Sequence, residues 1–260
     1  MNGTGLITLL TDFGLDDPYV GVLKAVLLQG CPSARMVDLS HALQPYDTRA
    51  AAFWIERVFG WFPARTVHVV VVDPGVGSPR RAIVVAAHGQ FFVGPDNGVL
   101  SGIYARDPQA EARDIIPGVV GLAPPSRTFH ARDVFAPVAA GLAQGTLVFE
   151  KVGGLITTLA EAVLPLAVES GTTLVGQVVA VDHFGNALTN LSQPPLAGRY
   201  EARVGGHRLP IVGTYADGAV GDIFALFGSF GTLELAMREG HAATALGVSS
   251  GTLVELYRVG

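Results

Sequence analysis

Asp73 and Arg80 are the residues whose types and spacing most suggest chemistry, because they flank a glycine-rich turn directly after the valine run 69–72. A carboxylate can accept a proton, whereas an arginine stays charged and can only stabilise or orient an anion. Four consecutive valines have no polar face, so they predict a strand buried on both sides, as in a parallel sheet. Open α/β sheets bind ligands beyond the carboxyl ends of such strands. The alternative for this segment alone is a capping Asp and solvated arginines.

Two further polar segments of the N-terminal half have the same character. Asp12 follows the apolar run 6–10, and Asp17 lies within a turn of it. An Asp just past a strand end can accept hydrogen bonds from a sugar diol, although helix capping accounts for carboxylates at such places equally well. His130 lies between a proline-rich loop and a predicted helix start, where an imidazole can face a reacting group or simply be a surface histidine.

The C-terminal half carries two turn segments that either close hairpins or contact a ligand. Asp182, Phe184 and Asn186 belong to the turn Asp182-His183-Phe184-Gly185-Asn186, and Ser229 lies in Gly228-Ser229-Phe230-Gly231. Gly-Asn is strong turn chemistry, so a plain hairpin is one interpretation. In the other interpretation, Phe184 is an aromatic platform and Asn186 bonds the edge of a base.

Composition narrows the class of protein. The chain has 260 residues, 49% of them hydrophobic, and a net charge of −5 without any basic run, so nucleic acid is not an expected partner. Its single cysteine, Cys31, forms no internal disulfide, which fits a reducing compartment. No apolar run approaches the ~20 residues that span a bilayer, and the N-terminus is unlike a signal peptide. We therefore expect a soluble, cytoplasmic protein without a membrane contact.

Several familiar cofactor and metal patterns are missing. The seven histidines and one cysteine show no His-x-x-x-His or Cys-x-x-Cys spacing, so no metal site is expected. The chain has neither a Gly-x-Gly-x-x-Gly turn after a strand nor a Gly-Lys-Ser/Thr P-loop. The absence of a Gly-x-Ser-x-Gly elbow counts against an α/β-hydrolase.

The hydrophobic periodicity predicts an α/β fold with two domains. An N-terminal α/β domain, residues 1–165, is expected to contain a mainly parallel sheet flanked by helices, and residues 166–260 a C-terminal all-β barrel. The predicted helices cover 18–29, with Asp17 as N-cap, 48–59, 97–105, and 134–144, with Asp133 as cap. The predicted strands cover 6–10, 36–39, 69–72, 82–87, 91–93, 174–182, 187–191, 200–204, 208–212, 223–227, 233–237 and 253–257.

Taken in order, five motifs resemble one family, the S-adenosyl-L-methionine (SAM) hydroxide adenosyltransferases, which are hydrolytic relatives of the SAM-dependent fluorinase and chlorinase. The resemblance extends from Leu6 to about Leu256. Its motifs are Thr11-Asp12-Phe13-Gly14, Asp73-Pro74-Gly75-Val76-Gly77, Gly94-Pro95-Asp96-Asn97-Gly98, Phe129-His130-Ala131-Arg132-Asp133 and Asp182-His183-Phe184-Gly185-Asn186.

The resemblance implies cleavage of SAM by water to adenosine and L-methionine, without metal or cofactor, in a homotrimer that binds substrate between subunits. It places Asp73, Arg80 and His130 around the attacking water. It also implies substrate contacts: Asp12 with the ribose diol, Tyr46 beside the ribose, Asp17, Asp182 and Ser229 with the methionine end, and Phe184 and Asn186 with adenine. How Asp73 and His130 share the proton stays open at this point.

Three alternatives remain. A chlorinase-like halogenase is the nearest, although the halogenating branch carries a tyrosine in place of the Asp and an inserted loop that this sequence lacks. A non-catalytic SAM- or adenosine-binding protein is the second, and it would not need Asp73, Arg80 and His130 together. An unrelated α/β-hydrolase is the third.

Overall fold

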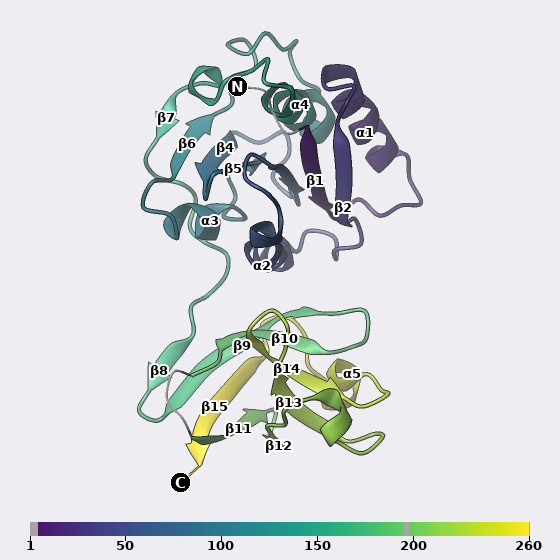
Figure 1. Cartoon of the computed structure of the whole chain (residues 1–260), viewed down its shortest axis with the longest axis vertical. Coiled ribbons are helices and arrows are strands. Elements are labelled where there is room, and N and C mark those ends of the chain that lie inside the picture. The colour runs from purple at the N-terminus through teal and green to yellow at the C-terminus, as the bar shows by residue number, and fades with distance from the viewer. Residues whose placement is uncertain (1–4, 195–197, 260) are drawn as a thin grey trace. The chain divides into compact units, whose positions relative to one another are not determined.

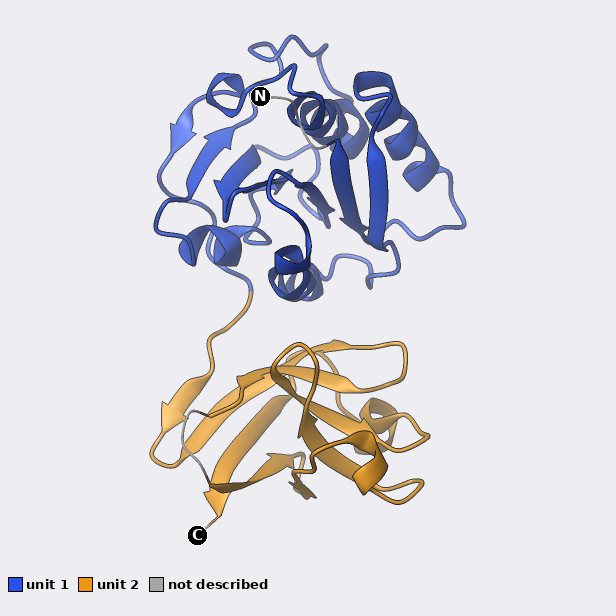
Figure 2. Ribbon diagram, viewed as in Figure 1, with its two compact units in different colours: residues 1–163 blue, residues 164–260 orange. Residues whose placement is uncertain are grey.

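The computed structural model describes residues 5–194 and 198–259. The chain divides into two compact units, Met1–Val163 and Leu164–Gly260, shown in blue and orange in Figure 2. None of the helices in the described parts of the chain combines the length and apolar character needed to cross a membrane.

Unit 1 is built on a seven-stranded mixed sheet (Figure 1). The strands from one edge to the other are β2 (Arg35–Ser40), β1 (Leu6–Thr11), β3 (Val67–Val71), β5 (Gln90–Pro95), β4 (Ala82–Ala87), β6 (Glu111–Asp114) and β7 (Leu155–Ile156). The first four run parallel, while β5–β4, β4–β6 and β6–β7 are antiparallel.

The sheet is therefore mixed, and the expectation of a mainly parallel sheet is corrected. The reason is local: β4 and β5 are joined by only His88 and Gly89, both at positive φ (52° and 71°). A two-residue turn of this kind joins antiparallel strands, since a parallel pair needs a crossover of a dozen residues or more. The strands β6 and β7 then extend the antiparallel part and were not expected from the sequence.

The valine strand lies between β1 and β5, as its two-sided hydrophobicity predicts. Residues Val69 to Val72 are each at most 2% exposed. On one sheet face, Ile7, Leu9 and Val69 pack in one core cluster with α1 (Tyr19–Gly30) and α4 (Ala136–Gln144). A polar residue just after the carboxyl end of β3 is thus attached to a rigid, buried strand.

Three helix starts differ from the sequence prediction. Helix α1 has Pro18, not Asp17, at its N-cap, with no side-chain cap. Asp133 does not cap α4, because a π-helical turn, Ala131–Phe135, precedes that helix. Helix α3 (Ser101–Ala105) begins four residues later than predicted, because Asn97 donates from Nδ2 to the Val72 carbonyl (2.9 Å) and accepts from Val99 N–H (3.3 Å).

The remaining helix of unit 1 agrees with the prediction. Helix α2 (Thr48–Val58) begins after Asp47, whose carboxylate accepts from Ala50 N–H at 2.9 Å. Short 3₁₀ turns follow at Phe59–Trp61 and Phe149–Lys151.

Unit 2 is an antiparallel sheet that curls until it nearly closes. Its order is β12 (His207–Pro210), β11 (Arg199–Val204), β15 (Leu253–Val259), β9 (Thr173–Val181), β10 (Ala187–Ser192), β14 (Thr232–Met237) and β13 (Ile223–Phe227), with β8 (Val168–Ser170) beside β9. An isolated bridge, Ile211 to Ala225, links the segment after β12 to β13. The seven predicted strands of this half are all present; β8, α5 (Ala242–Leu246) and a 3₁₀ turn, Tyr215–Asp217, were not predicted.

Candidate active site

A cavity of about 340 Å³ in unit 1 collects four of the predicted site residues. Asp12 and Asp73 reach it from just beyond the carboxyl ends of the parallel neighbours β1 and β3, Tyr46 from the loop before α2, and His130 from the segment before the π-helical turn. Parallel neighbours end at the same sheet edge, so strands far apart in sequence bring their first loop residues together.

Arg80 joins this group by gripping Asp73. Its Nε donates to Asp73 Oδ1 at 2.7 Å and its Nη2 donates to Asp73 Oδ2, a two-pronged pair. Both side chains are nearly buried, at 9% and 7% exposure for Arg80 and Asp73. Arg80 comes seven positions after Asp73, and the turn between them is closed by Ser78, whose hydroxyl donates to the Gly75 carbonyl at 2.6 Å.

Gly77 connects this turn to the His130 segment. It has φ 79°, and a Cβ at that position would clash with the carbonyl oxygen of Arg127. Only glycine permits both this backbone conformation and this close approach. The two loops that carry Arg80 and His130 are thus packed backbone to backbone.

The same guanidinium also contacts the imidazole. Arg80 Nη2 lies 3.0 Å from His130 Nδ1. A guanidinium has no acceptor, so Nδ1 must be the unprotonated nitrogen and the neutral ring carries its proton on Nε2. Burial and the Arg80 charge lower the pKa of His130, against the opposing charges of Asp73 and Asp133. His130 is therefore neutral at neutral pH.

Asp133, predicted as a helix cap, instead ties down the His130 segment. It accepts from Arg132 Nε at 2.6 Å and from Ser126 N–H at 2.8 Å, and thus bridges the residues on either side of His130. The bonds from Arg132 are the main reason that the pKa of Asp133 is held well below its usual range.

Asp12 fixes the backbone of Tyr46, another residue that lines the cavity. Its Oδ2 accepts from the backbone N–H of Tyr46 at 2.8 Å. Tyr46 has φ 70°, a costly conformation for a residue with a side chain, and the residue is 72% exposed. The bond from Asp12 holds the Tyr46 backbone beside the cavity.

Three aromatic rings that the sequence analysis did not select also line the cavity. Phe13, Tyr19 and Phe129 pack edge to face, with centroids 5.4–6.3 Å apart. Phe13 and Phe129 lie inside motifs of the resemblance, but only tertiary packing shows that they form one wall. Asp17 is exposed and does not line this cavity.

In unit 2 the structure brings Asp182, Phe184 and Asn186 together. Asp182 Oδ1 accepts from Phe184 N–H (2.9 Å) and Asn186 N–H (2.8 Å), and Oδ2 accepts from Asn186 Nδ2 (2.9 Å). Asp182 thus shapes the turn itself. The ring of Phe184 is left 74% exposed, whereas Asn186 is buried. Ser229 is exposed on the separate hairpin between β13 and β14.

A buried carboxylate near Asp182 escaped the sequence analysis. Glu234 on β14 is 4% exposed, and Tyr215 donates its hydroxyl to Glu234 Oε2 at 2.7 Å. Burial, together with the charge of Asp182, raises the pKa of Glu234. An alternating strand pattern gives no signal for such a residue, because it places Glu234 on the outer face of β14.

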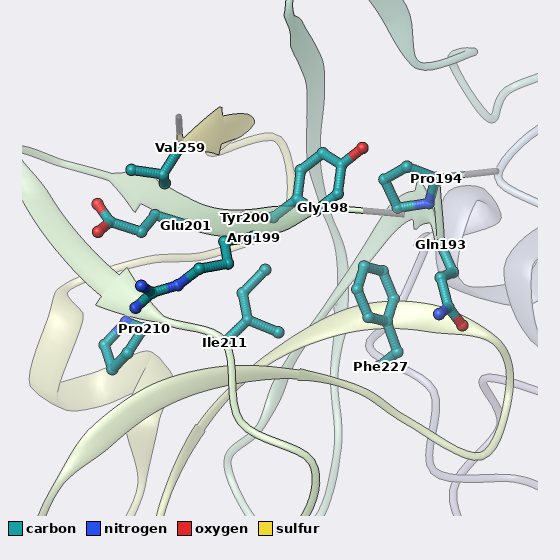
Figure 3. Close-up of a pocket in the computed structure, with 10 residues that line it drawn as sticks. All are labelled: Gln193, Pro194, Gly198, Arg199, Tyr200, Glu201, Pro210, Ile211, Phe227 and Val259. Atoms are coloured by element: carbon teal, nitrogen blue, oxygen red, sulfur yellow. The ribbon is translucent and has the colours of Figure 1, made fainter. Parts of the chain in front are cut away.

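A second cavity, of about 510 Å³, lies in unit 2 near the gap between β12 and β13 (Figure 3). Tyr200, Ile211 and Phe227 contribute apolar walls and Arg199 a charged one. None of the site residues predicted from the sequence lines it.

Comparison with known families decides the identity of the chain. Residues 7–153 match the SAM hydroxide adenosyltransferase N-terminal domain, and residues 176–255 match the corresponding C-terminal domain. The chain belongs to the SAM hydroxide adenosyltransferase family. The resemblance drawn from the sequence motifs is confirmed.

Relatives of this family member are similar over nearly their whole length. An (R)-S-adenosyl-L-methionine hydrolase of Thermus thermophilus is 44% identical, covering 95% of this chain and 97% of the relative. A fluorinase of Actinoplanes is more distant, at 28% identity over 99% of both chains. A solved Thermotoga maritima structure, an uncharacterized conserved protein, matches with TM-score 0.88 and 36% identity over 97% of this chain and 100% of its own.

Proposed function

We propose that the protein hydrolyses SAM to adenosine and L-methionine, by in-line attack of an activated water or hydroxide at ribose C5′. The observation that carries the proposal is the contact of Asp73, Arg80 and His130 at one cavity, in a chain 44% identical to a SAM hydrolase. Binding alone does not need a water-activating set of this kind.

The reaction suits a cavity in which fixed protein groups replace bulk water. A hydroxide-like anion attacks a sulfonium cation, the C5′–S bond breaks, and the thioether of methionine leaves as a neutral group. Both charges vanish, so replacing bulk water by fixed protein groups favours the step. The demand on the protein is to take a proton from water at neutral pH.

The hydrogen bonds favour Asp73 over His130 as the proton acceptor. Because Arg80 donates to Nδ1 of His130, the neutral ring has a proton on Nε2 and can only donate from there. Each oxygen of Asp73 accepts one N–H from Arg80 and keeps lone-pair capacity for the water. In this proposal Asp73 takes the proton, His130 Nε2–H orients the water, and Arg80 holds both.

The substrate contacts implied by the family are proposed for the other residues. Asp12 would accept from the ribose diol beside Tyr46, and Asp17, Asp182 and Ser229 would contact the methionine end. Phe184 and Asn186 would hold adenine: the ring is exposed for stacking, and the amide already donates to Asp182, which leaves its oxygen to accept from the base.

Product analysis tests the function directly. Purified protein incubated with SAM in chloride-free buffer is expected to release adenosine and L-methionine in equal amounts, measured by liquid chromatography. A parallel reaction in chloride addresses the halogenase alternative, since a chlorinated nucleoside would replace our proposal. Binding of SAM without any product on long incubation would instead identify a sensor.

Substitutions at the water site give the first prediction. Asp73→Asn keeps the shape but removes the proton acceptor, so kcat is expected to fall by ~10²-fold or more. The kcat of His130→Ala should fall by a similar factor. His130→Asn keeps a donor and an acceptor, so it should retain more activity than His130→Ala.

Asp96→Asn is the matched control. Asp96 accepts from Arg81 Nε at 2.8 Å, a second Arg–Asp pair in the same unit that does not line the cavity. It should lower thermal stability and leave kcat largely unchanged. Wild-type turnover in both Asp73→Asn and His130→Ala would eliminate the assignment.

Other expectations, drawn from the resemblance or from the composition and pattern of the sequence, remain proposals. These are a homotrimer, the absence of a metal or cofactor, a cytoplasmic location, and domains that meet at residues 165–166. Sedimentation equilibrium is expected to give three times the 27.1 kDa chain mass, and dialysis against a chelator is expected to leave turnover intact.

A further inference from the structure

The Arg80 guanidinium has one neighbour that the water site does not explain. The ring of Phe135 lies under it, with the guanidinium carbon 5.5 Å from the ring centroid. Phe135 is fully buried. A cation over an aromatic face that is shielded from water is stabilised by its attraction to the ring. Arg80 thus donates to Asp73 and His130 and lies over the Phe135 ring.

His130 and Phe135 are five residues apart, and an α-helical turn would not place both on one guanidinium. In an α-helix, residues three and four apart share a face. Here the intervening residues, Ala131–Phe135, form a π-helical turn, closed by the Ala136 N–H donating to the Ala131 carbonyl. The wider turn places residues five apart, such as His130 and Phe135, on nearly the same face, so both side chains reach Arg80.

Pro137 supplies a cause for this turn. In a continuous α-helix its nitrogen would pair with the Asp133 carbonyl, but proline has no N–H and its ring clashes with the carbonyl four residues earlier. The wider π-helical turn relieves that clash. At the second position of α4, where Pro137 lies, a missing N–H costs little.

We propose that Pro137 and the π-helical turn it imposes position the hydrolytic site, with Phe135 acting as a positioning residue that fixes the plane of Arg80 against Asp73 and His130. The inference rests on the proposed function for its kinetic consequence. The geometric part, that Phe135 keeps Arg80 on His130, does not depend on which substrate is turned over.

Phe135→Leu and Pro137→Ala test the proposal. Leucine removes the aromatic face with little loss of volume, and alanine restores the N–H that permits an α-helical turn. Each is expected to lower kcat for SAM about tenfold, since sub-ångström misplacement of a catalytic group already costs rate, while KM changes less than about twofold.

The second readout is the pKa of His130, measured by NMR titration of the imidazole in the free protein. The groups that face the ring are Arg80, Asp73 and Asp133, with the Ser126 carbonyl. Arg80 lowers this pKa, so loosening Arg80 should raise it in both variants. Looser packing that hydrates the ring would also raise this pKa, because burial is the largest cause of its lowering. The same NMR spectra must therefore also show that the ring leaves the Nε2–H tautomer that the Arg80 contact enforces. Neither readout needs turnover, so together they decide the positioning role even if SAM is not hydrolysed.

Phe149→Leu is the matched control, because Arg113 lies over the buried Phe149 ring at 5.2 Å in the same unit, outside the cavity. It should lose stability but keep wild-type kcat and His130 pKa. If Phe135→Leu does not fold, Pro137→Ala decides alone. Wild-type kcat and His130 pKa in the folded variants, or the same changes in Phe149→Leu, would overturn the proposal.

Discussion

Arg80 is the residue that holds the proposed water site together. A guanidinium offers five N–H donors in one plane, and here they reach both oxygens of Asp73, Nδ1 of His130 and, at 3.2 Å from Nη1, the carbonyl of Arg81. Because all these contacts are donations from Arg80, both oxygens of Asp73 and Nδ1 of His130 act as acceptors. One side chain thereby orients the other two.

A pH profile of kcat/KM tests this at the residue scale. The pKa of His130 is lowered from 6.5, so the ring stays neutral when the pH falls somewhat below that value. Protonation of His130 would place a proton on Nδ1, which faces the Arg80 guanidinium. The value of kcat/KM should therefore decline only at pH below 6.5. An acid limb above pH 6.5 would contradict the geometry of the pair, and in His130→Asn the limb due to this ring should disappear.

At the scale of elements, loop ends rather than strands carry the chemistry. The strands β1 and β3 end side by side, and their first loop residues supply Asp12 and Asp73. The turn after β3 then packs through Gly77 against Arg127, in the segment that leads to His130. Backbone contact between two loops replaces the rigidity that a helix or strand would provide.

Gly77→Ala tests that contact. The new Cβ would meet the Arg127 carbonyl at a backbone conformation that alanine disfavours, so the His130 segment must shift. We expect kcat to fall at least about tenfold. Gly121→Ala is the matched control, because Gly121 has a similar φ of 73° but nothing within 4 Å of the added Cβ. Equal kinetics for the two variants would show that the loop contact is not needed.

At the scale of the whole molecule, a histidine other than the proposed catalytic His130 is expected to contribute to stability. His68 is fully buried on β3, where Nδ1 pairs with the Thr8 hydroxyl at 2.7 Å and Nε2 with Gln90 Oε1 at 3.0 Å. Burial lowers the pKa of His68 to about 4, and the Gln90 bond only partly opposes this. It does not line the cavity and belongs to the core.

The pKa of His68 predicts a loss of stability in acid. The unfolded chain binds this proton near pH 6.5 and the folded one only near pH 4, so the stability present above pH 6.5 declines between these values, by about 3 kcal/mol. Urea unfolding followed by tryptophan fluorescence reports unit 1 alone, since both tryptophans, Trp54 and Trp61, lie there. In His68→Phe, the decline in the free energy of unfolding that His68 causes between pH 6.5 and pH 4 should vanish. An unchanged decline in this variant would refute the prediction.

Much of the architecture follows from local patterns. The valine run had to be a two-sided buried strand, because it has no polar face, and the alternation after residue 165 led to each of the seven strands predicted there. The predictions that failed concern the direction of one strand and the starts of helices. The direction of β4 depends on a two-residue turn. Asp17 caps no helix because Pro18 holds the N-cap position of α1, and Asp133 caps none because a π-helical turn precedes α4.

The amino-acid sequence by itself determined which side chains could do the chemistry, because acids, an arginine and a histidine placed at strand and helix ends are visible as residue types in order. Only the tertiary structure decided that Arg80 touches both Asp73 and His130, that Phe135 lies under it, and which ring nitrogen of His130 bears the proton. Residues 50 positions apart meet through the packing of a whole sheet and its loops, and hydrogen-bond direction depends on that meeting.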